Sequence, residues 1–198
     1  NGFNADIDPF NGLFSGRVDM NTIGTLGHSR GGEGVARHFR LNQEQGAPHA
    51  ISAVMLLAPT NFFREVIDAA SLAVVLPYCD GDLLDLQGVH YYDDARYSLA
   101  GDAFPKHLFL TMGSNHNFYN SVWTPNSSPL GAMSTPGARD DWLYFDDRHC
   151  GLDSVERLNS QQQRSTATAL ITTFFRTYLG GETELGNILT GNAAIPSS

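Results

Sequence analysis

The chain has 198 residues, of which 41% are hydrophobic, and it carries a formal net charge of −9 with a pI near 5.0. This length and apolar content predict one globular domain over residues 1–198, with a buried core. The acidic charge argues against nucleic acid or an anionic membrane as a partner, and no apolar run approaches the length of a membrane span.

The first predicted elements are a short strand over 22–26 and a helix that begins after residue 29. Gly46 and Pro48 are stop signals that end this helix near residue 45. Residues 51–59 then form a nearly continuous apolar run, which is typical of a parallel strand buried on both faces. The start of the chain therefore predicts a strand, a helix and a second strand.

The next elements repeat this alternation. We expect a short helix over 61–70, a buried strand over 72–77, a partly helical stretch over 86–99 and a third buried strand over 106–112. Such alternation predicts an α/β fold with a mostly parallel sheet and flanking helices.

The last third of the chain has a different character. Residues 121–156 are rich in Pro, Gly, Ser, Asp and aromatics, and we interpret them as an irregular insertion, a lid or a wall of a cleft. An amphipathic helix follows over 160–178, with Ser160 as a candidate N-cap and Gly180-Gly181 at its end.

The most informative motif is Gly27-His28-Ser29-Arg30-Gly31-Gly32, a G-x-S-x-G sequence between the predicted strand and helix. This context is that of a nucleophile elbow, in which a serine stands at a strained strand-to-helix turn. The flanking glycines would let the strand and helix approach each other. The helix N-terminus would direct its N–H groups at the reaction centre, so we expect the N–H of Arg30 to donate to an oxyanion.

Three chemically distinct residues follow the ends of three predicted strands: Ser29, an aspartate within 80–85, and His116. Parallel strands place their carboxyl ends at one sheet edge, where ligands bind. Serine could attack a carbonyl, histidine could take and return its proton, and a carboxylate could orient the imidazole. The order serine, acid, histidine is that of an α/β-hydrolase triad.

The chain resembles the C-terminal part of an α/β-hydrolase, closest to the cutinase and polyester-hydrolase branch of lipases and esterases. The matching stretches are the elbow motif, Cys79-Asp80-Gly81-Asp82-Leu83-Leu84 and Gly113-Ser114-Asn115-His116-Asn117. The resemblance implies a Ser29–His116–Asp82 triad that hydrolyses a small or polymeric carboxylic ester through an acyl-enzyme. It implies no organic cofactor and no metal.

The resemblance also implies where substrate binds. In that branch an aromatic residue follows the proline after the second of these strands. Here Thr60 and Asn61 follow Pro59, and Phe62 comes next, so we expect these three residues to line the substrate site. His28, beside the nucleophile, is expected to contact the substrate or to pack behind the site.

A complete α/β-hydrolase has several strands before the elbow, one of whose loops gives the second oxyanion donor. Only 28 residues precede Ser29 here. We therefore expect the chain to be part of a longer protein, or to have a second chain complete its sheet along the edge at 22–26.

Several alternatives stay open. The same triad could cleave a thioester or an amide, or the chain could be a non-catalytic fragment. Asp80 or Asp85 could replace Asp82 as the acid, or the three could bind a cation. Cys79 and Cys150 could form one disulfide or stay as buried thiols, and a composition poor in Lys but rich in Asn, Ser, Thr and Gly suggests secretion.

Overall fold

The computed structural model describes residues 12–79, 87–121 and 158–195. Its centre is a four-stranded sheet in which all neighbouring strands are parallel. The strands stand in the order β1 (Ile23–His28), β2 (Ile51–Leu57), β3 (Ser71–Cys79) and β4 (Lys106–Ser114). The predicted α/β arrangement is therefore confirmed.

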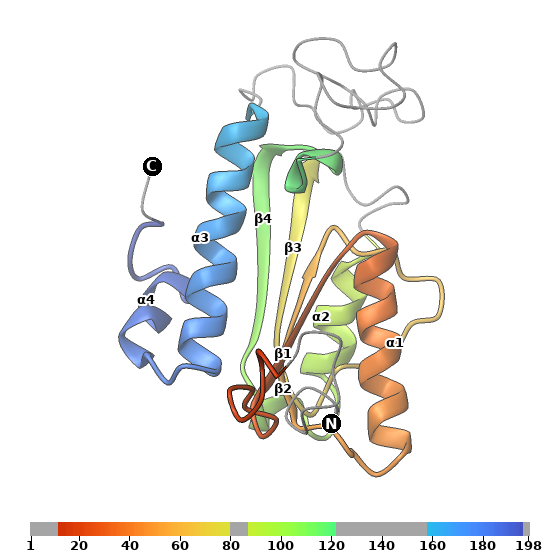
Figure 1. Ribbon diagram of the computed structural model, residues 1–198. Helices are drawn as coiled ribbons and strands as arrows, with labels where there is room; N and C mark the ends of the chain where they lie inside the picture. Colours follow the sequence, from red (N-terminus) through yellow and green to blue (C-terminus); the bar gives the residue numbers. More distant parts are fainter. Residues whose placement is uncertain (1–11, 80–86, 122–157, 196–198) are drawn as a thin grey trace.

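Helices cover both faces of this sheet (Figure 1). On one side lie α1 (Arg30–Glu44) and α2 (Val89–Arg96), and on the other lies α3 (Ser160–Tyr178), with the short α4 (Gly186–Leu189) against it. Three short 3₁₀ helices complete the described elements: η2 (Gly101–Ala103), η3 (Asn117–Tyr119) and η6 (Thr183–Leu185).

The two central strands explain the apolar runs seen in the sequence. Alternate side chains of a strand point to opposite faces, so Val54 and Leu56 enter the core beneath α1 and α2, while Met55 and Leu57 enter the core beneath α3. All four are buried. A strand covered on both faces is mostly apolar, which is why residues 51–57 contain one polar residue, Ser52, and no polar alternation.

The segment between β2 and β3 differs from the prediction. Residues 61–70 are not helical. The backbone N–H groups of Phe62 and Phe63 donate to the side chain of Glu33, and Arg64 has a positive φ of 52°. A residue in the left-handed region interrupts a right-handed helix, so the tertiary contact decides the conformation here.

The N-terminal boundary of α3 also shifts by one residue. Asn159, not Ser160, is the N-cap, and its side chain accepts hydrogen bonds from the N–H groups of Gln161 and Gln162. The side chain of Gln162 accepts in turn from the N–H of Asn159, at 2.9 Å, which completes a capping box.

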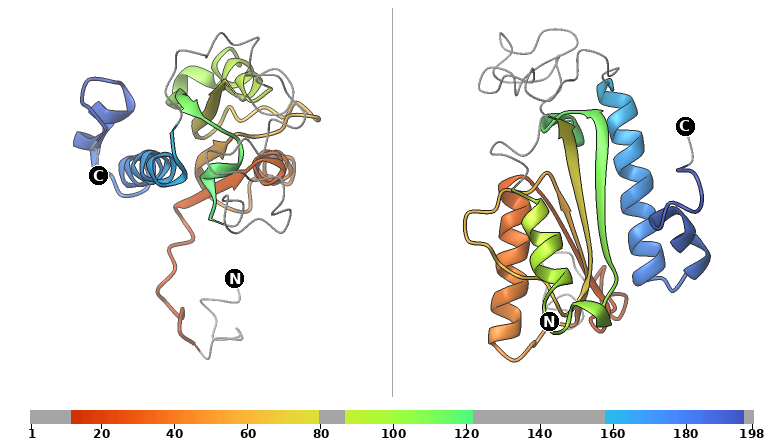
Figure 2. Two further views of the ribbon diagram at one scale, coloured as in Figure 1. Left: turned by 90° about the horizontal axis from the view of Figure 1, so that it is seen from above. Right: turned by 180° about the vertical axis from the view of Figure 1, so that it is seen from behind.

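Among the described strands, β1 is at one edge of the sheet, and the residues before it lead away from the body of the molecule (Figure 2). Leu26 on this strand is an exposed apolar side chain. None of the described helices is long and apolar enough to cross a lipid bilayer. The predicted insertion at 121–156 lies almost entirely outside the described residues, as does Cys150 of the predicted cysteine pair.

Candidate active site

Ser29 occupies the sharp turn between β1 and α1. Its backbone has a φ of 58° and a ψ of −127°, a conformation that L-residues rarely adopt. A non-glycine residue held in this way costs on the order of 1–3 kcal/mol and is typical of functional sites. Two hydrogen bonds fix the turn, because the Ser29 N–H donates to Leu57 O at 2.9 Å and the Gly32 N–H donates to Ser29 O at 2.9 Å.

The glycines around Ser29 play unequal parts. A Cβ at Gly27 would lie 2.2 Å from the carbonyl oxygen of Gly31, and one at Gly32 would lie 2.8 Å from Cβ of Pro59. A Cβ at Gly31 would meet nothing within 4 Å. The close approach of strand and helix therefore depends on Gly27 and Gly32, although the motif pairs Gly27 with Gly31.

His116 follows β4 and its side chain lies beside Ser29. The Nε2 atom of His116 is 2.9 Å from Oγ of Ser29, which is hydrogen-bond distance. The imidazole is only 3% exposed, whereas Ser29 is partly exposed and so can meet a ligand. Two residues 87 positions apart in the chain thus come together at the carboxyl ends of β1 and β4, in Figure 1 the upper end of the sheet.

The environment of His116 favours a neutral imidazole. Burial, and to a lesser extent repulsion from a positive charge on the neighbouring His28, together lower the pKa of His116 to about 3. A neutral imidazole can accept a proton from a hydroxyl group, whereas a protonated imidazole cannot.

His28 packs behind the site and contacts His116 directly. Its Nε2 donates to the backbone carbonyl of His116 at 2.8 Å, and the two ring centroids are 4.9 Å apart. Because a carbonyl only accepts hydrogen bonds, this contact places a proton on Nε2 of His28. Burial lowers the pKa of His28, and the bond to the carbonyl partly opposes this effect. The contact ties the residue before Ser29 to the loop of His116.

A second contact to this loop was not predicted from the sequence. Gln163, buried on α3, donates to Asn115 O at 2.6 Å and accepts from the Asn115 N–H at 2.9 Å. The Asn115 side chain accepts from the N–H groups of Asn117 and Phe118. These bonds join the first turn of α3 to the residue before His116. The one sequence signal that could have indicated this contact is a polar residue, Gln163, on the apolar face of the predicted helix.

The three residues after β2 that are expected to line the substrate site are all described by the structure, and their environments differ. Thr60 is buried, and its N–H donates to Ser29 O at 3.3 Å. The Asn61 N–H donates to the side chain of Gln87 at 3.0 Å. Phe62 is exposed, with the guanidinium of Arg30 5.6 Å from the centre of its ring. Of the three, Phe62 is exposed and Asn61 is partly exposed, so these two have the exposure that a ligand contact requires, whereas Thr60 does not.

Arg30 is the first residue of α1, so its N–H has no partner within the helix. It directly follows Ser29 and is therefore placed to donate to an oxygen developing negative charge near Oγ. Asp82, and with it Asp80 and Asp85, lies outside the described residues. Among the residues that are described, no three His, Cys, Asp or Glu side chains are grouped as a metal ion would need.

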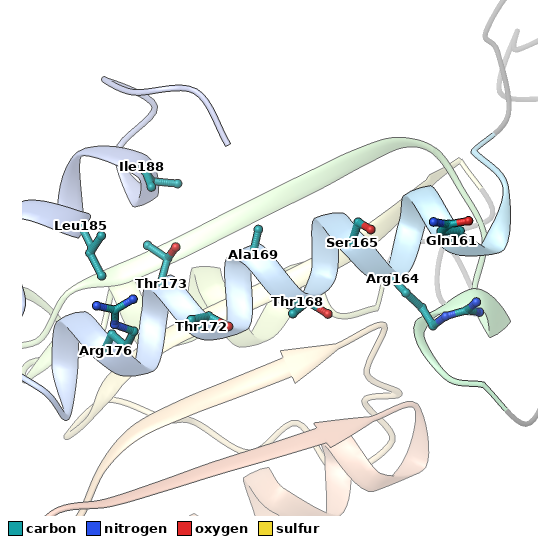
Figure 3. A pocket seen from close by; sticks show the side chains of 10 residues that line it. All are labelled: Gln161, Arg164, Ser165, Thr168, Ala169, Thr172, Thr173, Arg176, Leu185 and Ile188. Atoms are coloured by element: carbon teal, nitrogen blue, oxygen red, sulfur yellow. The ribbon is translucent and has the colours of Figure 1, made fainter. Parts of the chain in front are cut away.

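A groove of about 600 Å³ lies elsewhere, between α3 and the C-terminal segment (Figure 3). Arg164 and Arg176 stand near its ends, and Leu185 and Ile188 form an apolar wall. Arg176 is already paired with Glu182, and Arg164 donates to Asn120 O. None of the lining residues belongs to the Ser29–His116 site.

Comparisons of the chain with protein-family models, with characterised proteins and with solved structures found no match.

Proposed function

We propose that this chain is a serine hydrolase of α/β-hydrolase type that cleaves carboxylic esters. One observation carries the proposal: Ser29 stands in a strained strand-to-helix turn with its Oγ 2.9 Å from Nε2 of a buried histidine. A surface serine needs neither strain nor a buried imidazole. Both are what an activated nucleophile requires.

The reaction would proceed in two halves. With its proton on Nδ1, His116 accepts the hydroxyl proton of Ser29 at Nε2 while Oγ forms a bond to the ester carbonyl carbon. The N–H of Arg30 donates to the resulting oxyanion. Collapse of this intermediate breaks the carbon–oxygen bond of the leaving alcohol, which takes the proton from His116. Water then repeats the sequence and releases the acid from Ser29.

The third member of the proposed triad, Asp82, is assigned from the sequence resemblance. Nδ1 of His116 is buried from solvent, and the resemblance assigns Asp82 to orient this nitrogen. A carboxylate there would keep the proton on Nδ1 and stabilise the imidazolium that forms during attack. Because the attack is the same for thioesters and amides, the preference for esters rests on the resemblance alone.

The test is hydrolysis of p-nitrophenyl butyrate by the chain and by its Ser29→Ala and His116→Gln variants. We expect both variants to lose activity by a factor on the order of 10⁴ or more. A fluorophosphonate should label wild-type Ser29, as shown by peptide mass spectrometry, and should label His116→Gln far more slowly. A folded wild-type chain that neither hydrolyses the ester nor reacts with the fluorophosphonate would contradict the proposal.

A further inference from the structure

Two adjacent aromatic side chains stand in solvent beside the elbow. Phe62 and Phe63 are 54% and 73% exposed, although phenylalanine is normally buried. They lie in the segment after β2, and the guanidinium of Arg30, the residue after Ser29, is 5.6 Å from the ring centre of Phe62. Exposed apolar groups next to a reactive centre point to contact with a ligand.

Glu33 holds this pair in place. It lies one turn beyond Ser29 on α1 and is only 6% exposed. Its Oε1 accepts from the N–H of Phe62 at 2.5 Å and from the N–H of Phe63 at 3.0 Å, and its Oε2 accepts from Oγ1 of Thr60 at 2.8 Å. A carboxylate is buried only when such donors surround it, so these three hydrogen bonds account for the burial of Glu33.

Thr60 links the same segment to the nucleophile. Besides its bond to Glu33, its N–H donates to Ser29 O at 3.3 Å, and its own carbonyl accepts from the hydroxyl of Tyr91 at 2.8 Å. Contacts therefore run from the backbone of Ser29 through Thr60 to Glu33, and from Glu33 to the two phenylalanines. A shift of the carboxylate would move the aromatic pair relative to Ser29.

We propose that Glu33 is a positioning residue that fixes Phe62 and Phe63 as an apolar platform for the hydrocarbon part of the substrate. The platform gives the site a preference for esters with long or aromatic acyl groups over acetyl esters. This inference rests on the proposed ester hydrolysis at Ser29. The inference adds the class of ester that the site prefers and names Glu33 as the residue that positions the platform.

The test compares p-nitrophenyl octanoate with p-nitrophenyl acetate, which share one leaving group. We expect wild type to favour the octanoate in kcat/KM. The double variant Phe62→Ala, Phe63→Ala should lose this preference by about tenfold, mainly through a higher KM for the octanoate, with a smaller effect on the acetate. Both rings are exposed, so this variant should fold normally.

Glu33→Ala should lower the same selectivity, because it removes the Oε1 atom that accepts from both backbone N–H groups. Glu33→Gln keeps an oxygen that can accept from both groups, so this conservative variant should retain the selectivity. Arg37→Ala is the matched control. Arg37 also joins α1 to this segment, through an ion pair with Glu65, but it contacts neither phenylalanine backbone. Its octanoate-to-acetate ratio should equal that of wild type.

Four results would overturn the proposal. In the first, the double Phe variant and Glu33→Ala keep the wild-type ratio, and the platform then has no role in selectivity. In the second, Glu33→Ala loses activity on both esters equally, and Glu33 is then only structural. In the third, wild type hydrolyses the acetate as efficiently as the octanoate, and the site then has no preference for long acyl groups. In the fourth, wild type hydrolyses neither ester, and the proposed function fails together with the inference.

Discussion

Gly27 and Gly31 both flank Ser29, but only Gly27 lies where no side chain can fit. Its Cβ would be 2.2 Å from the backbone oxygen of Gly31, which cannot rotate away as a side chain could. We predict that Gly27→Ala lowers the free energy of unfolding by about 3 kcal/mol, the upper range for overpacking, and abolishes the proposed esterase activity. Urea denaturation followed by circular dichroism measures the first effect.

Gly31→Ala is the matched control for this prediction. The new methyl group would meet nothing within 4 Å, and alanine is favoured over glycine in a helix by about 0.5–1 kcal/mol. This variant should be as stable as wild type or slightly more stable. Equal destabilisation of the two variants would show that the turn is not packed as described.

The buried imidazole of His116 makes a second prediction at the level of single residues. Its pKa is lowered to about 3, chiefly by burial, so this proposed general base stays neutral in mildly acidic solution. The acid limb of kcat/KM against pH should therefore lie well below 6.5, the usual value for histidine. His28→Gln removes the neighbouring charge and should move this limb upward. A wild-type limb at or above pH 6.5 would be inconsistent with this environment.

At the level of elements, the side chain of Gln163 fastens α3 to the residue before His116. Gln163 pairs with both the N–H and the carbonyl of Asn115. Gln163→Ala leaves these buried groups without that partner, so we expect a loss of about 2 kcal/mol in unfolding free energy. We also expect kcat to fall with little change in KM, because the loop carries His116. Thermal unfolding and steady-state kinetics on p-nitrophenyl butyrate measure the two effects.

Gln161→Ala is the control, because Gln161 is exposed on the same first turn of α3. Its stability and kcat should match wild type. If Gln163→Ala behaves like this control, the amide pair does not hold the loop.

The same elements show what could be predicted from the sequence. Apolar runs marked the buried strands because burial on both faces leaves a local signature, and the elbow motif placed Ser29 because its neighbours are local as well. The segment at 61–70 was predicted wrongly because Glu33, about 30 residues earlier, takes its N–H groups. Gln163 and Asn115 are 48 residues apart. Such long-range partners leave no local pattern.

At the level of the whole molecule, three buried or half-buried histidines should make the fold sensitive to acid. Burial lowers the pKa of His28, His107 and His116, so below pH 6.5 the unfolded chain binds more protons than the folded chain. Stability is then fully present above pH 6.5 and is lost as the pH falls toward the folded values. His116 alone should contribute a loss of about 2 kcal/mol between pH 6.5 and pH 5.

The variant His107→Gln tests this pH dependence. His107 bonds the hydroxyl of Tyr178 on α3, at 2.7 Å, so glutamine should keep a polar partner there and weaken the pH dependence of stability. His38 is exposed on α1 and serves as the control, so His38→Gln should leave the pH dependence of stability unchanged. Urea denaturation at pH 7, 6 and 5 measures the slope, and a free energy of unfolding that stays constant over this range would contradict the burial of these imidazoles.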